Sequence, residues 1–262
     1  MNAETALAAA AALVSLAFAA ATYERWGLSR ARHEAAWTIA LGLFCAAAGA
    51  LWWGAGIGWT LPAFRIFYLL GAVLNVPILA LGTIYLLSSD HRRADRIALA
   101  TGAALAFAAG VVVSAPAVAA VPAHELPRGS EVFGWAPRLL AALASSLGAI
   151  VLFAGAVWSI LRRGRRVGGG RRAVANALIA LGTLVLSVGG LFNSVADEMT
   201  AFALSLVLGV AALFAGFLVA SGGSSATLTT DPVTQRLDEW LGEPSPLDGV
   251  ASDGPGEPAV TP

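Results

Sequence analysis

Seven long apolar stretches, separated by short connections, constrain this chain more than any other feature of its sequence. A helix needs about 20 residues to cross the hydrocarbon core of a bilayer, and each stretch is near or above that length. Helices are expected because lipid offers no hydrogen-bond partner to an unpaired backbone amide. The predicted fold is therefore all-α, a polytopic membrane protein with seven transmembrane helices at Thr5–Tyr23, Ala35–Trp53, Leu61–Leu87, Ile97–Ala119, Leu139–Leu161, Ala173–Phe192 and Met199–Ala220.

The composition of the chain agrees with a membrane protein. Of its 262 residues, 58% are hydrophobic and 12% are charged, whereas a soluble domain carries about 25% charged residues. The first apolar stretch is preceded by Glu4 and by no positive charge, which is the reverse of a secretory signal peptide. We therefore predict that this stretch is a retained helix and that residues 1–221 form one transmembrane bundle.

Arginine is concentrated in every second connection between the spans. All 16 basic residues are arginine, and twelve of them fall in the first, third and fifth connections. The even-numbered connections hold only Arg128 and Arg138, together with several carboxylates. The positive-inside rule places arginine-rich connections in the cytoplasm, so the N-terminus is predicted outside and the C-terminus in the cytoplasm. The absence of lysine is typical of a GC-rich bacterial genome, and the predicted location is the plasma membrane, crossed several times.

Two pairs of spans share short sequence matches. Residues 39–42 and 179–182 both read Ile-Ala-Leu-Gly, and the third and seventh spans share Ala-Phe and Leu-Gly pairs at matching positions. These matches predict a 3+1+3 arrangement of parallel repeats with the fourth span as connector, although matches among alanine, leucine and glycine also arise by chance. The layout resembles in architecture the sugar-exporting seven-helix transporters. The Pro-Gln pairs of that family are absent here, and the only glutamine is Gln235.

Glycine and tryptophan predict how the helices pack and where they end. Glycines at heptad spacing let neighbouring helices approach closely in lipid, and four pairs occur: Gly42/Gly49, Gly148/Gly155, Gly182/Gly189 and Gly209/Gly216. Tryptophans fall near the ends of the predicted spans, as in the aromatic belts of membrane proteins. Those expected at the outer boundary are Trp52, Trp53, Trp59 and Trp135, and those expected at the inner boundary are Trp26, Trp37 and Trp158.

The third span is the most polar, and it carries the predicted ligand site. At 100° per residue, Arg65, Tyr68 and Asn75 lie on one face of a helix. Pro77 lacks an amide proton and is expected to leave the carbonyl of Val73 without its usual partner. Polar groups beside a broken helix at membrane depth often line a cavity. We therefore predict a pocket for a small molecule or lipid headgroup that opens outward, with Arg65 holding an anion.

The alternative is a structural role for these residues. Arg65 lies only about 6 Å along its helix from Leu61, so it can extend outward and pair with Asp197 or Glu198. Asn75 lies too deep for this, and it must form hydrogen bonds to a neighbouring helix or to a ligand. Its candidate partners on other helices are Asn176, Ser187, Ser145 and Ser146.

The connection after the fifth span is the most basic segment of the chain. It holds six arginines around a run of three glycines: Arg162, Arg163, Arg165, Arg166, Arg171 and Arg172. These side chains are candidates for contact with anionic lipid, or they act only as an anchor that fixes the topology. Binding of nucleic acid is not expected of so short a loop.

Residues 222–262 are predicted to form a mostly disordered, acidic cytoplasmic tail. A segment rich in proline, glycine and serine cannot bury a hydrophobic core. One short amphipathic helix is expected near residues 232–241, since a capping residue precedes it and a glycine follows it. Its apolar face, formed by Leu237, Trp240 and Leu241, either docks a cytoplasmic protein partner or lies on the lipid or the bundle.

The residue types that usually carry catalysis are scarce in the spans. The three histidines do not have metal-ligand spacing, no lysine is present to bind retinal, and no carboxylate lies in the interior of a predicted span. We therefore predict no catalytic residue, no metal and no cofactor. The predicted function is non-enzymatic binding or passive transport of a small molecule or lipid. The alternative is a membrane sensor or assembly protein that acts through its tail and its arginine-rich loops.

Overall fold

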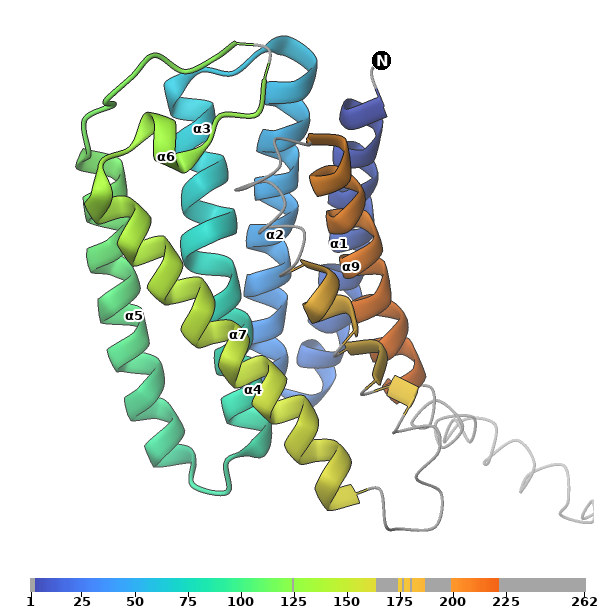
Figure 1. The fold of residues 1–262 in the computed structure, drawn as a ribbon. Helices are drawn as coiled ribbons and strands as arrows, with labels where there is room; N and C mark the ends of the chain where they lie inside the picture. Colours follow the sequence, from blue (N-terminus) through green and yellow to red (C-terminus); the bar gives the residue numbers. More distant parts are fainter. Residues whose placement is uncertain are drawn as a thin grey trace, which may run out of the picture. The chain divides into compact units, whose positions relative to one another are not determined.

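The computed structural model describes residues 3–123, 125–163, 174–175, 177–179, 181–186 and 199–221 (Figure 1). This part of the chain is helical apart from loops and one isolated bridge between Ala117 and Phe133. The elements are α1 (Ala3–Ser29), α2 (Arg32–Ile57), α3 (Leu61–Phe67), the π-helix η1 (Tyr68–Asn75), α4 (Val76–Leu87), α5 (His91–Ser114), α6 (Gly129–Val132), α7 (Trp135–Arg163) and α9 (Met199–Ser221). The chain divides into two units, Met1–Ala220 and Ser221–Pro262.

Six helical stretches in the described residues are long and apolar enough to cross a membrane. They are Ala3–Ser29, Arg32–Ile57, Leu61–Leu87, His91–Ser114, Trp135–Trp158 and Thr200–Val219. They match six of the seven predicted spans, and the helical membrane-protein character is confirmed. The predicted sixth span coincides with a shorter apolar helix, Ala177–Leu186. Seven spans, the orientation and the internal repeat therefore stay predictions.

The fourth predicted span differs from the structure at both ends. α5 begins at His91, six residues earlier than expected, because the Asp90 side chain caps it by accepting a hydrogen bond from the backbone N–H of Arg93 at 3.2 Å. It ends at Ser114 and not at Ala119. Pro116 accounts for this end, since a residue that precedes proline is driven out of the helical conformation, and Ala115 is extended.

α1 packs closely along α2 and α9 through small and aromatic side chains. Ser15 and Thr22 of α1 are fully buried, as are two of its alanines. Both hydroxyl groups donate to carbonyls of their own helix, so neither is left unpaired at membrane depth. The ring of Phe18 stacks on the ring of Phe214 in α9, with 5.0 Å between the centroids. These contacts form a core shared by α1, α2 and α9.

Two of the heptad glycine pairs behave in opposite ways. Gly148 and Gly155 of α7 lie against α4, and a Cβ atom at Gly148 would be 2.9 Å from Cγ1 of Val76. Gly42 and Gly49 of α2 have nothing within 4 Å of such an atom in the part of the chain that the structure describes. Among the described residues, the α7 pair therefore packs closely against a neighbouring helix and the α2 pair does not.

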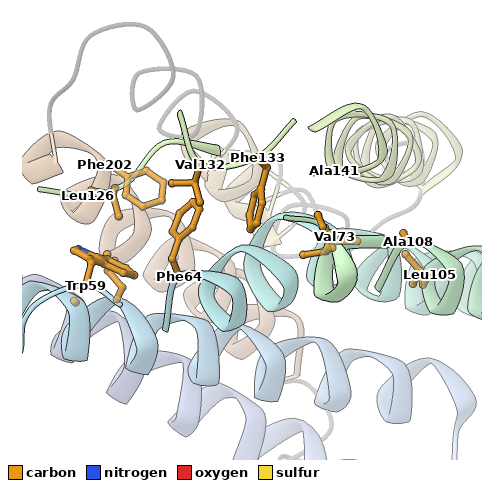
Figure 2. Close-up of a cluster of buried hydrophobic side chains, with 14 residues drawn as sticks. Trp59, Phe64, Val73, Leu105, Ala108, Leu126, Val132, Phe133, Ala141 and Phe202 are labelled. Atoms are coloured by element: carbon orange, nitrogen blue, oxygen red, sulfur yellow. The ribbon is translucent and has the colours of Figure 1, made fainter. Parts of the chain in front are cut away.

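A second core lies at the end of the bundle where α3 begins and where α6 and its flanking loops fold back over it (Figure 1). Figure 2 shows Phe64 and Phe133 within it, and their rings stack with centroids 5.5 Å apart. Trp59 packs edge-on against Phe64 and is only 4% exposed. Trp59 therefore belongs to this core. The expectation that it lies in a lipid-facing aromatic belt was wrong.

Candidate functional site

Arg65, the predicted anion-binding residue, is engaged with the protein backbone. Its Nη2 donates a hydrogen bond to the carbonyl oxygen of Ala115, directly after α5. Its Nε is buried and has no hydrogen-bond partner in the described residues. The predicted ion-pair partners Asp197 and Glu198 lie outside these residues. Among the described residues, the hydrogen bond of Arg65 therefore links α3 to the backbone directly after α5.

Tyr68 lies in the packed core beneath α6. Its ring is 5.1 Å from the ring of Phe133 and 5.7 Å from that of Phe64, measured between centroids. A Cβ atom at Gly129 would be 2.6 Å from Cε2 of Tyr68, so the glycine allows the loop to close over the tyrosine. Arg65 and Tyr68 are thus both held by the segment that covers α3.

Asn75, the third predicted residue, is 8% exposed. Its side-chain amide forms no hydrogen bond within the described part of the chain. Two of its candidate partners, Asn176 and Ser187, lie outside that part, and Ser146 is exposed. The expectation that Asn75 needs a partner rests on the cost of an unpaired amide in hydrocarbon, about several kcal/mol. That expectation stays a prediction.

The helix around Asn75 is π-helical, and this changes which carbonyl Pro77 leaves unpaired. In an α-helical register the missing amide would have faced Val73, as predicted. In a π-helix each carbonyl accepts a hydrogen bond from the amide five residues later. In η1 the carbonyl of Ala72 would therefore need the amide of Pro77, which has no N–H to donate. The hydroxyl of Ser145 in α7 donates to the Ala72 carbonyl at 2.6 Å. The bond from α7 therefore replaces the one that proline cannot make.

Ser145→Ala is expected to lower the free energy of unfolding by about 1–2 kcal/mol, because it leaves the Ala72 carbonyl unpaired away from water. Ser146→Ala is the matched control, since Ser146 is the next residue on α7 and is exposed. Reversible unfolding in mixed detergent micelles would measure both variants. Equal stabilities would show that Ser145 does not support the π-helix.

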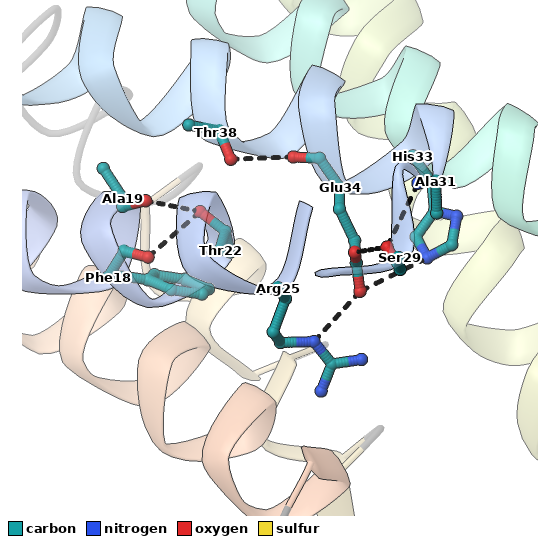
Figure 3. Close-up of polar contacts among 9 residues, drawn as sticks. All are labelled: Phe18, Ala19, Thr22, Arg25, Ser29, Ala31, His33, Glu34 and Thr38. Atoms are coloured by element: carbon teal, nitrogen blue, oxygen red, sulfur yellow. Dashed lines mark hydrogen bonds and ion pairs between the residues drawn. The ribbon is translucent and has the colours of Figure 1, made fainter. Parts of the chain in front are cut away.

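A buried ionic cluster, unexpected from the sequence, joins α1 to α2 at the end where α1 finishes (Figure 3). Glu34 is 3% exposed, although it lies only one residue before the predicted span. Arg25 donates through Nε to Oε1 of Glu34 at 3.0 Å, and the Ser29 hydroxyl donates to Oε2. Nε2 of His33 lies 4.0 Å from Oε1. The guanidinium of Arg25 also lies over the Phe217 ring, so the cluster reaches α9.

A second ionic cluster joins α2, α4 and α5 at the same end of the bundle. Nη1 of Arg32 donates to both carboxylate oxygens of Asp95. The hydroxyl of Tyr85 donates to Oδ1 of Asp95 at 3.0 Å. The side chains of Arg32 and Asp95 are 52% and 46% exposed, so this pair is accessible from outside the protein. We call these three residues the Arg32 cluster.

An apolar groove of about 450 Å³ lies beside the Arg32 cluster. α4 contacts both α2 and α5 and forms the floor of the groove, while α2 and α5 form its walls. Its lining is Ala36 and Ile39 of α2, Leu74 of η1, Ile78 and Leu81 of α4, and Gly102, Leu105, Ala106 and Ala109 of α5. Arg65, Tyr68 and Asn75 do not line it, although Leu74 is the neighbour of Asn75.

The other predicted site residues fall mostly outside the described residues. Arg162 and Arg163 end α7, and nothing is described of their side chains. The remaining arginines of that connection and the tail residues are not described: Arg165, Arg166, Arg171, Arg172, Leu237, Trp240 and Leu241. Within the described ranges no three His, Cys, Asp or Glu side chains are placed to hold a metal ion.

Comparison of the chain with known protein families, with curated proteins and with solved structures finds no match. The groove, the two ionic clusters and the π-helix are therefore the observations on which a function must be argued.

Proposed function

We propose that this protein is a non-enzymatic membrane protein that binds a lipid or another amphipathic small molecule in the groove between α2, α4 and α5. The observation that carries the proposal is the groove itself. Its volume of about 450 Å³ falls within the range of about 300–1,000 Å³ that is usual for ligand pockets. Its lining residues are all apolar.

The location of the groove favours a ligand that arrives from the bilayer. Its walls belong to helices that are long and apolar enough to span a membrane. The side of the groove formed by α5 carries small residues such as Gly102 and Ala106, which leave space for a ligand. A Cβ atom added at Gly102 would meet no atom of the described residues within 4 Å. A hydrocarbon chain can therefore lie along the groove without displacing a side chain. Passive movement of such a ligand along the groove is compatible with this arrangement.

Gly102→Leu is expected to weaken ligand binding, because the new side chain would occupy the groove. Gly110→Leu is the matched control, since Gly110 lies on the same helix, also has open space around it and does not line the groove. The measurement is the rise in thermal midpoint of the detergent-purified full chain on titration with phospholipid. We expect the wild type and Gly110→Leu to be stabilised alike and Gly102→Leu to need several-fold more lipid. Identical titrations for all three proteins would contradict the proposal.

A further inference from the structure

We propose that the ligand of this groove is an anionic phospholipid, whose acyl chain lies in the groove and whose phosphate binds Arg32. This inference rests on the proposed function and names the chemical class of its ligand. Three observations support it. The lined faces of the three helices continue to the Arg32 cluster, Arg32 has N–H donors that Asp95 does not use, and positive charge surrounds Arg32.

The lining residues of each helix continue, at helical spacing, to one member of the Arg32 cluster. On α2 the face that carries Ile39 and Ala36 reaches Arg32, and on α4 the face that carries Leu81 reaches Tyr85, one turn beyond the groove. On α5 the residue two turns before Gly102 is Asp95. Arg32 and Tyr85 both donate to Asp95, so a polar cluster lies beyond this end of the apolar lining.

Arg32 retains the capacity to bind a phosphate while Asp95 stays in place. Only its Nη1 is used by Asp95, whereas a guanidinium offers five N–H donors in a fork that matches phosphate. Its side chain is 52% exposed. Tyr85 donates to Asp95 independently, so Asp95 keeps a hydrogen bond if Arg32 turns towards a ligand. The bond between Arg32 and Asp95 can therefore break while the Asp95 carboxylate keeps its hydrogen bond from Tyr85.

The surroundings of the cluster carry an excess of positive charge. Arg92, Arg93 and Arg96 at the start of α5 are exposed, and none of them forms an ion pair among the described residues. Asp90, the other carboxylate of this turn, caps the helix. An anionic headgroup is therefore attracted here, with a contribution of about 1 kcal/mol, or roughly fivefold in affinity, for each nearby arginine.

The test compares phosphatidylglycerol with phosphatidylcholine of the same acyl chains, titrated into the detergent-purified full chain and read as the thermal midpoint. We expect the wild type to prefer phosphatidylglycerol and Arg32→Gln to lose about fivefold of that preference. Asp95→Asn should strengthen the preference, because it removes the competitor for Arg32. Arg138→Gln is the control, since Arg138 is exposed and lies at the start of α7, at the opposite end of the bundle from the Arg32 cluster, and its loss should change the preference little.

The possible outcomes separate this inference from the proposed function. If Gly102→Leu weakens both lipids but Arg32→Gln and Asp95→Asn leave the affinities for both lipids unchanged, the groove binds lipid and the phosphate assignment is wrong. If Arg32→Gln weakens both lipids alike, the assignment of an anionic lipid is wrong. If Gly102→Leu weakens neither lipid, the proposed function itself fails, and this inference with it. Stabilisation by inorganic phosphate as large as that by phosphatidylglycerol would also overturn the inference, because the acyl chain would then contribute nothing.

Discussion

Arg25→Met is expected to lower the free energy of unfolding by about 3 kcal/mol. Removal of one partner of a buried ion pair typically costs about 3–5 kcal/mol, since the other charge stays buried without compensation. Here the charge that stays is Glu34, which is 3% exposed and, among the described residues, keeps the Ser29 hydroxyl as its one donor and His33 at 4.0 Å. The Arg25 side chain is 38% exposed, which places the expected loss at the lower end of that range.

The opposite substitution should cost less, because the two partners differ in exposure. Glu34→Met leaves Arg25, which can turn its guanidinium to solvent, so a loss of about 1 kcal/mol is expected. The double variant Arg25→Met with Glu34→Met should be more stable than Arg25→Met alone, since no buried charge is left. Unfolding in mixed micelles would measure all three, with the exposed Arg93→Met as control. Additive losses in the double variant would show that the two residues act independently.

Gly148→Ala is expected to cost about 2–3 kcal/mol, because the new methyl group meets backbone atoms that cannot rotate away. Its Cβ would lie 3.0 Å from the nitrogen of Pro77 and 3.0 Å from the carbonyl carbon of Val76. α7 would have to move away from α4, and that movement would also stretch the hydrogen bond from Ser145 to Ala72. The loss should therefore be non-additive with that of Ser145→Ala.

Gly155→Ala provides the comparison on the same helix. Its Cβ would meet Cγ2 of Thr83 and Cδ1 of Leu87, which are side-chain ends that can shift, so a smaller loss is expected. Gly110→Ala on α5 meets nothing within 4 Å in the described residues and should lose no stability. The free energy of unfolding, measured as above, should rank Gly148→Ala as the least stable. Equal losses for the two α7 variants would mean that the backbone contact at Gly148 is not tight.

Hydrophobic length was sufficient to place six helices, and local chemistry explains where the prediction failed. The fourth span was extended too far because Pro116 was not used as a stop signal. The burial of Glu34 was not predicted because an apolar run begins only at the next residue. Arg25 on the preceding helix was a signal that Glu34 could form an ion pair. Trp59 was assigned to the membrane boundary because the sequence does not show that α6 and its loops cover it.

The groove could not be predicted from the sequence for a different reason. It depends on the axial rotation of α2, α4 and α5 relative to one another, which no single helix determines. The predicted site on the third span used ideal α-helical angles for Arg65 and Asn75. The structure inserts a π-helix between these two residues, so the angles do not hold across that segment.

That π-helix also sets the angular phase between the two halves of the Leu61–Leu87 span. A π-helical turn holds one residue more than the α-helical turn it replaces, and one residue corresponds to about 100° of rotation. Converting η1 to regular α-helix with every residue kept would rotate Leu81 and Tyr85 by that angle relative to Arg65, and deleting one residue between Tyr68 and Asn75 at the same time would cancel the rotation. The end of the bundle that α6 covers and the groove between α2, α4 and α5 are thus aligned with each other by one additional residue.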